Sequence, residues 1–289
     1  MPYSNVDGEA VVQVSGGFGN QLFQYAFGKQ LEADRGCRVL YDVDFYKASH
    51  AVTHNRLHLD KLGFDLPIYA GRSARLRLAR KLKRLSPHLQ QGIVGLAYLK
   101  CPATQYQPVH PVTGQAYYAG LWQSPKYFAG IETEIRDAYR ERLLASVPDS
   151  PEIRPDVIGF HVRRGDYLAH KQSHNLDYVA YLDAALARLK DVTGRTNWKI
   201  SVYTDAPEWC DDNLGDHDIE VNRDNGMLDD FLGLMQCEHK IISNSTFSWW
   251  AAFLGAEAGG LTLAPQHWHA DVNVDSSEIL MKDWIVIDS

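Results

Sequence analysis

The sequence predicts an α/β protein with two domains, of which the carboxyl-terminal one is built on a parallel sheet. Apolar runs alternate with amphipathic stretches through the carboxyl half, as strands and helices do around a parallel sheet. The amino-terminal end shows the same order around a glycine-rich turn. At about 100 to 200 residues per domain, 289 residues favour two domains. Pro148, Pro151 and Pro155 indicate a linker, so we expect domains at 1–150 and 151–289.

The amino-terminal domain opens with a strand, a loop and a helix. Val11–Val14 is a short apolar run, and Leu22–Ala33 has apolar residues at helical spacing. Gly36 favours a helix end, and Arg38–Asp42 has the pattern of the next strand. The glycines of the loop Gly16–Gln21 allow a ligand to approach the backbone closely. A dinucleotide-binding G-x-G-x-x-G loop is not favoured, because the third glycine is missing.

A basic helical stretch is predicted at 72–89. No Asp or Glu lies between Asp65 and Glu132. Pro87 should end or kink the helix, and its apolar face would consist of Leu78, Leu82, Leu85 and Leu89. We favour a solvated helix whose leucines face the core over a helix that contacts an anionic membrane surface through Arg72–Arg84.

An aromatic and proline-rich stretch follows, and 137–144 is the end of a further helix. Tyr118 and Trp122 lie in this stretch beside amide side chains, a composition that suits sugar binding. We therefore predict that Tyr118 and Trp122 bind an acceptor sugar, with core packing as the alternative interpretation.

The carboxyl half is predicted to fold as a regular succession of strands and helices. Strands are expected at 157–162, 198–204, 219–222, 240–243, 261–264 and 284–287, and helices at 177–190, 227–238 and 245–255.

Charged and polar residues follow three of these strands, at the edge of the sheet where α/β proteins bind ligands. His161, Arg163 and Arg164 come at the end of one strand, Asp205 after the next, and Asn244 after a third. Two guanidinium groups at one turn are well suited to binding a pyrophosphate. The alternative is a surface ion pair between an arginine and Asp166.

Hydroxyl side chains begin the helix at 245–255. Ser245 and Thr246 are good helix caps, and they could also hold a phosphate or ribose together with free backbone N–H groups. Asn244-Ser245-Thr246 also matches a glycosylation sequon, which we dismiss because no secretory signal precedes it and an apolar helix adjoins it.

Composition excludes several classes of protein. A net charge of −7 argues against a general nucleic-acid binder. The four cysteines are widely spaced, which indicates free thiols and no zinc site. Asp42-Val43-Asp44 could hold a divalent cation, but two solvated loop acids are the simpler interpretation, and we predict no metal. Because signal peptide and membrane span are both missing from the sequence, we expect a cytoplasmic protein that contacts the inner membrane at most peripherally.

Four motifs together resemble those of the α-1,2-fucosyltransferases of glycosyltransferase family 11. They occur in the family's order, at Gly16–Ala26, His161–Tyr167, Val202–Asp205 and Ile241–Trp250. More remotely, the H-x-R, F-G-N-Q and S-T-F elements are similar to protein O-fucosyltransferases and α-1,6-fucosyltransferases.

The resemblance implies a GT-B-type pair of Rossmann-like domains that face a central cleft, with the acceptor on the 1–150 side and the donor on the 151–289 side. It implies inverting transfer of L-fucose from GDP-β-L-fucose to the 2-hydroxyl of a terminal β-galactoside, as in O-antigen or other glycan synthesis, without a cofactor or metal. Arg163, Asn20 and Asp166 would be catalytic. The donor-binding residues would be Gly17, Phe18, Gly19, His161, Arg163, Arg164, Asp205, Asn244, Ser245, Thr246 and Phe247.

The chain departs from the family pattern in two places. Thr204-Asp205-Ala206 stands where the family often has Ser-Asp-Asp, and the region between Asp44 and Tyr117 matches poorly, which leaves the acceptor open. Besides the donor-binding Asp205, Asp166 is the one acid fixed by the motifs, and it could brace the arginines instead of accepting a proton. The alternatives to a transferase are a non-catalytic sugar-nucleotide or glycan-binding module and a NAD-dependent oxidoreductase.

Overall fold

The computed structural model describes residues 9–48, 56–70, 74–101, 105–109, 112, 114–147, 153–165, 176–215, 217–256, 260–269, 271 and 273–288. The chain forms two compact units, Met1–Ile135 and Arg136–Ser289. The division lies within helix α5 (Glu132–Ala145), upstream of the proline-rich segment where a boundary was expected. The remainder of α5 belongs to the second unit, because the ring of Tyr139 lies 5.3 Å from that of Trp250 and Arg140 donates a hydrogen bond to the Leu254 carbonyl.

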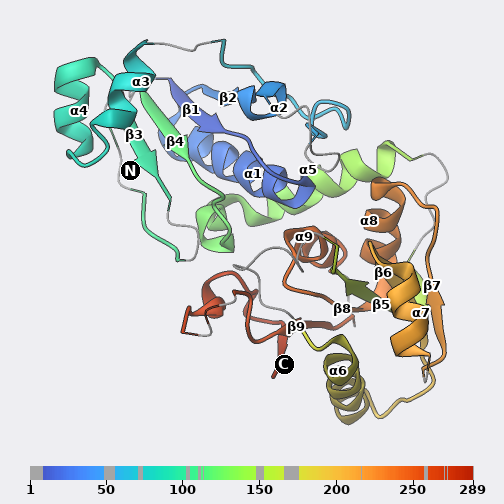
Figure 1. Ribbon diagram of the computed structural model, residues 1–289. Helices are drawn as coiled ribbons and strands as arrows, with labels where there is room; N and C mark the ends of the chain where they lie inside the picture. Colours follow the sequence, from blue (N-terminus) through green and yellow to red (C-terminus); the bar gives the residue numbers. More distant parts are fainter. Residues whose placement is uncertain are drawn as a thin grey trace. The chain divides into compact units, whose positions relative to one another are not determined.

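The first unit contains a four-stranded parallel sheet in the order β2-β1-β4-β3 (Figure 1). The strands are β1 (Ala10–Gln13), β2 (Val39–Asp42), β3 (Ala97–Lys100) and β4 (Ala116–Ala119). Helix α1 (Phe18–Arg35) follows β1 and ends at Gly36, whose φ of 59° is in the left-handed region that glycine adopts without strain. The short elements are α2 (Asp44–Ala48) and the 3-10 turns η1 (Pro125–Tyr127) and η2 (Ala129–Ile131). The sequence did not predict β3 and β4.

The basic stretch forms two short helices, α3 (Ala74–Lys81) and α4 (Pro87–Val94), where one helix was expected. Pro87 begins the second helix, behind an N-cap at Ser86 whose hydroxyl accepts a hydrogen bond from the Leu89 amide. The expectation that the leucine stripe faces the core is wrong. Leu76 and Ala79 are the buried residues of α3, whereas Leu78, Leu85 and Leu89 are exposed.

The second unit contains a six-stranded parallel sheet in the order β10-β9-β8-β5-β6-β7. If β5 to β10 are renumbered 1 to 6, the strand order read from the β7 edge is 3-2-1-4-5-6. This is the strand order of the Rossmann fold. The strands are β5 (Arg154–Val162), β6 (Lys199–Thr204), β7 (Ile219–Val221), β8 (Cys237–Ile241), β9 (Thr262–Pro265) and β10 (Ile285–Ile287). The predicted α/β class with parallel sheets is therefore confirmed, and the expected cleft stays a prediction.

Helices cover both faces of this sheet. One face buries Phe160, Val202 and Ile241 against residues of α6 (Tyr178–Thr193) and α7 (Pro207–Leu214). On the other face, Gly159 and Tyr203 pack against α8 (Met227–Gln236), which is followed in the chain by α9 (Thr246–Leu254) and the 3-10 turn η4 (Ser276–Glu278). Added Cβ atoms at Gly159 and at Gly233 of α8 would lie 2.7 Å from neighbouring side chains, so these glycines permit close packing of helix on sheet.

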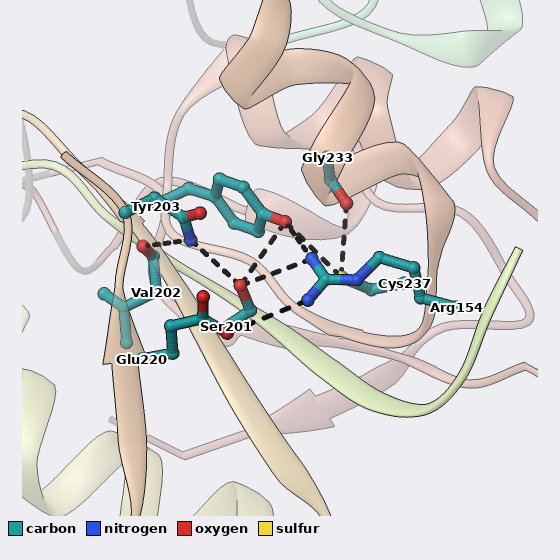
Figure 2. A network of polar contacts seen from close by, with 8 residues as sticks. Arg154, Ser201, Val202, Tyr203, Glu220, Gly233 and Cys237 are labelled. Carbon is teal, nitrogen blue, oxygen red and sulfur yellow. Dashed lines mark hydrogen bonds and ion pairs between the residues drawn. The ribbon is translucent and has the colours of Figure 1, made fainter. Parts of the chain in front are cut away.

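A polar network anchors the start of β5 beneath α8 (Figure 2). Arg154 donates to the Tyr203 hydroxyl at 2.8 Å and to the Ser201 hydroxyl at 3.4 Å. Cys237 donates to the Gly233 carbonyl at 3.2 Å. The pairing of β5 with β8 shifts register between Arg154 and Ile158, so these contacts hold the strand where its ladder is irregular.

Candidate active site

The two arginines and Asp205 meet at the carboxyl edge of the second sheet. β5 and β6 are neighbours, so the residues that follow them are close in space. Arg163 forms an ion pair with Asp205 at 3.0 Å, and both side chains are about three-quarters buried, with exposed fractions of 25% and 22%. Asp205 also accepts hydrogen bonds from the backbone N–H groups of Arg164 at 2.8 Å and Gly165 at 3.1 Å. One carboxylate therefore holds both the loop backbone and the guanidinium.

Tyr178 fixes the same loop from the other side. Its hydroxyl accepts a hydrogen bond from the Arg163 amide at 3.0 Å and donates one to the Arg163 carbonyl at 2.8 Å. Tyr178 is the first residue of α6 and is 2% exposed. Sequence reasoning missed Tyr178, although its position at a helix start and its capacity both to donate and to accept were visible signals.

Arg164 has a different environment from Arg163. Its guanidinium lies over the ring of Trp209 in α7, 4.0 Å from the ring centroid. A stacked guanidinium of this kind buttresses the loop. The donor-binding role of Arg164 stays a prediction.

His161 joins β5 to the loop after β8. Its Nδ1 is 2.7 Å from the Ser243 hydroxyl, and its ring stacks on Phe247 with centroids 5.4 Å apart. Burial, aided by the charge of Arg163, lowers the pKa of His161 from 6.5 to about 3. His161 is therefore neutral at physiological pH. β5 and β8 flank the point where the strand order reverses, which is where Rossmann sheets bind nucleotides.

The segment after Ser243 begins helix α9. Ser245 occupies the N-cap position, but its side chain makes no capping hydrogen bond. Helix capping, the alternative interpretation of Ser245, therefore does not explain why a hydroxyl side chain lies at this position. Asn244 is 3% exposed and donates to the Trp268 carbonyl at 3.2 Å, whereas Thr246 and Phe247 are partly exposed at the helix start.

The glycine-rich segment of the first unit places Asn20 in the first turn of α1. Gly17 is the N-cap, Phe18 and Gly19 are the first helical residues, and Phe18 contacts the ring of His58. Asn20 accepts a hydrogen bond from the Gln123 side chain at 2.7 Å. Because Gln123 donates to the oxygen of the Asn20 amide, the orientation of that amide is fixed.

Two buried glutamines, which the sequence reading did not single out, hold this turn. Gln21 donates to the carbonyls of Gly16 and Arg56 and accepts from the His58 amide. Gln24 accepts from the Ser15 amide and donates to the Gly120 carbonyl. Both glutamines are fully buried on the face of α1 that is otherwise apolar, and that contrast in polarity was the available signal.

Tyr118 and Trp122 are buried, at 0% and 3% exposure. Trp122 stacks on Phe27 with centroids 3.8 Å apart, and it lines a cavity of about 350 Å³ together with Lys100, Cys101 and Tyr127. The cavity lies beyond the carboxyl ends of β3 and β4, the same edge that carries the Asn20 turn. The acceptor role of Tyr118 and Trp122 stays a prediction.

The acids of the D-x-D triplet have protein partners. Asp42 accepts a hydrogen bond from the Tyr117 hydroxyl at 2.7 Å, and Asp44 pairs with Lys47 at 2.9 Å. Within the described part of the chain, His, Cys, Asp and Glu side chains form no group of three that could hold a metal ion. Asp166, the third residue predicted to be catalytic, lies outside the described residues.

The profile of the family described as glycosyl transferase family 11 matches residues 97–288, which is more than half of the chain and includes the Arg163 loop, Asp205 and the α9 segment. The chain belongs to glycosyl transferase family 11. The family resemblance read from the motifs is confirmed, and this family 11 chain is a glycosyltransferase.

Two relatives and one solved structure show what the family 11 chain is similar to. An α-1,2-colitosyltransferase of Escherichia coli is 25% identical over 300 residues, which cover 96% of this chain and 98% of that protein. The galactoside α-(1,2)-fucosyltransferase 1 of Rattus norvegicus is 36% identical over 149 residues, covering 46% of this chain and 37% of that protein. The solved structure of fucosyltransferase NodZ from Bradyrhizobium is 15% identical, covering 86% of this chain and 93% of that one, with a TM-score of 0.44.

Proposed function

We propose that the protein transfers L-fucose from GDP-β-L-fucose to the 2-hydroxyl of a terminal β-galactoside, with inversion at the anomeric carbon. The observation that carries the proposal is the Arg163 loop, held by Asp205 and Tyr178 at the switch point of a Rossmann-ordered sheet. Family membership favours this transfer over a non-catalytic module or a NAD-dependent oxidoreductase. The relatives named for α-1,2-colitosyl transfer and for galactoside α-(1,2)-fucosyl transfer support the sugar chemistry.

Arg163 would stabilise the negative charge that develops on the β-phosphate as GDP leaves. A guanidinium can donate two parallel hydrogen bonds to phosphate oxygens, and a preorganised cation in a site sheltered from water stabilises developing charge strongly. Asp205 and Tyr178 supply the preorganisation by fixing the side chain and backbone of Arg163 before the donor binds. On this basis we propose that transfer does not require a metal.

The remaining donor contacts would come from two places in the chain. Ser243–Phe247, with a Ser245 hydroxyl that does not cap its helix, would hold the phosphates and nucleoside. Asn20 would act on the sugar end of the donor, with its amide oriented by Gln123. We propose that the second unit binds GDP-fucose and that the first binds the acceptor, which would use the cavity beside Trp122.

A colitosyl donor is the second candidate, because the relative that matches 96% of the chain is named for colitose transfer. Colitose is fucose without its 3-hydroxyl. A site that hydrogen-bonds this hydroxyl would discriminate strongly between the two donors, whereas an apolar site would not.

The test is a transfer assay with GDP-fucose, GDP-colitose and a panel of β-galactosides in the presence of excess EDTA. We expect a mass gain on a galactoside, and NMR of the product should show an α-1,2 linkage. Arg163→Ala is the inactive control. Tight NAD binding without GDP binding would refute the proposal, and activity that disappears with EDTA and returns with manganese would refute the metal-independent step.

A further inference from the structure

Exposed large apolar side chains gather on the α3–α4 segment. Among the described residues, nine large hydrophobic side chains are more than about a third exposed, and four of the nine fall within residues 78–93. These are Leu78 at 44%, Leu85 at 37%, Leu89 at 56% and Ile93 at 60%. Single exposed leucines are ordinary, but a cluster of four on one helical hairpin marks an interaction site.

Basic side chains are exposed on the same segment. The buried side of α3 is Leu76 and Ala79, so the helical repeat places Arg77, Leu78 and Lys81 on the opposite, outer side. The exposed Lys83 and Arg84 lie between the two helices. On α4, Leu89 and Ile93 are four residues apart and therefore lie on one face.

The positive charge of this surface is not neutralised by acids nearby in the chain. No Asp or Glu occurs between Asp65 and Glu132, although the whole chain carries a net charge of −7. Arg80 is exposed, but its guanidinium is engaged within the fold, because it donates to the Tyr117 hydroxyl and lies over the rings of Tyr98 and Tyr117. We therefore leave Arg80 out of the surface described here.

We propose that the basic apolar surface, defined as Arg77, Leu78, Lys81, Lys83, Arg84, Leu85, Leu89 and Ile93, binds the surface of an anionic phospholipid bilayer. Lipid phosphates would pair with the basic side chains, while the leucines and Ile93 would enter the boundary between headgroups and acyl chains. Nucleic acid offers phosphates but no apolar layer for these side chains, so a bilayer fits the surface better.

The hairpin suits binding in the plane of a membrane. α3 and α4 are each eight residues long. No helix among the residues that the structure describes is long and apolar enough to cross a bilayer. Figure 1 shows both helices beside β3, and Leu76 and Ala79 anchor α3 in a core cluster with Val11 and Tyr117.

The test is sedimentation of the whole protein with vesicles of phosphatidylglycerol and phosphatidylcholine in equal amounts. A basic residue near an anionic surface contributes about fivefold to the partition coefficient, so Arg77→Gln with Lys81→Gln should weaken binding roughly 25-fold. Leu89→Ser with Ile93→Ser should weaken it as well. Binding should be lost on vesicles of phosphatidylcholine alone and should fall as salt screens the charges.

Matched controls use exposed residues of the second unit. Arg188→Gln with Lys190→Gln makes the same charge change on α6, and Val192→Ser with Val286→Ser removes exposed apolar groups, so all four control substitutions should leave sedimentation unchanged. Circular dichroism and the melting temperature check that each variant is folded. The proposal is overturned if the surface variants and the control variants bind vesicles equally well, or if vesicle binding does not depend on salt and on anionic lipid. It is also overturned if the wild type binds DNA in preference to vesicles. Fucosyl transfer to a soluble acceptor should be unaffected by the surface variants, so this test is independent of the proposed function.

Discussion

Replacement of Asp205 by Asn tests whether this carboxylate positions Arg163. The substitution keeps the shape of the side chain but removes its charge, and it turns an N–H₂ group toward a backbone N–H of Arg164 or Gly165. A hydrogen bond to a charged group contributes about 1.5–3 kcal/mol, and the partly exposed ion pair with Arg163 adds at most about 1 kcal/mol. If about 2 kcal/mol of loop order is lost, the equilibrium constant for the ordered loop falls roughly 30-fold, and this factor is the largest possible fall in the competent population.

The assay is the initial transfer rate as a function of GDP-fucose concentration. We expect kcat to fall by up to that factor while KM for the donor changes little. On an Arg163→Ala background, Asp205→Asn should cost almost nothing further, because the group that it positions is gone. Asp211→Asn is the matched control, since Asp211 pairs with Arg223 on the exposed side of α7, where exposed pairs contribute little.

Two results would refute this reasoning. A raised KM for the donor with unchanged kcat would show that Asp205 contacts the donor, the role that the family resemblance implies. Additive losses in the double variant would show that Asp205 and Arg163 act independently.

Three further predictions follow from the same geometry. Arg163→Ala should reduce turnover about 10²- to 10³-fold and Arg163→Lys should recover little of it, whereas a lysine variant with half the wild-type rate would rule out the bidentate mechanism. Gly16→Ala should lower turnover more than GDP affinity, because Gly16 has a φ of 81° and an added Cβ would lie 2.6 Å from the Asn20 amide nitrogen. Gly92→Ala is the control, because Gly92 has open space around it and lies outside the candidate site. The unfolding free energy should fall by about 1.4 kcal/mol per pH unit as pH drops from about 6 towards 3, because the unfolded chain protonates His161 while the folded chain, with a pKa of about 3, does not. His161→Gln should flatten that slope in urea unfolding, and an unchanged slope would assign the pH dependence to other groups.

Sequence patterns were sufficient for the second unit because its parallel strands are buried on both faces. Such strands are nearly continuous apolar runs, as in Val157–Val162, and they can be located without tertiary information. β3 and β4 were missed because each is four residues long and rich in tyrosine and alanine, which gives no clear period. The break between α3 and α4 was visible as Ser86-Pro87, an N-cap followed by proline at the first helical position.

The spacing of the leucines in the basic stretch was not enough to predict which side of the helix is buried. Leu78, Leu85 and Leu89 share a stripe only if the helix continues past residue 81, and it does not. Once the chain breaks, Leu76 and Ala79 become the pair that faces the sheet. A periodicity argument therefore fails when it spans an unrecognised helix end.

The candidate site shows a related limit. Motifs located Arg163 and Asp205 at strand ends, and the adjacency of those strands could be expected from βα alternation. Two contacts depend on tertiary packing that no local pattern encodes. Asp205 faces Arg163 and two backbone amides, and Tyr178 contacts the same loop from the start of α6.

The polar network around Arg154, at the start of β5, helps to position the candidate active site at the carboxyl end of the same strand. His161 pairs with Tyr203 in the ladder between β5 and β6, and Arg154 binds the hydroxyl of that same tyrosine from the opposite end of the strand. A slip of one residue would turn His161 away from Ser243 and invert the side of the sheet on which every β5 side chain lies. Because Arg154 and Tyr203 oppose that slip, the register that brings His161 to Ser243 and delivers Arg163 to Asp205 is fixed by contacts at both ends of β5.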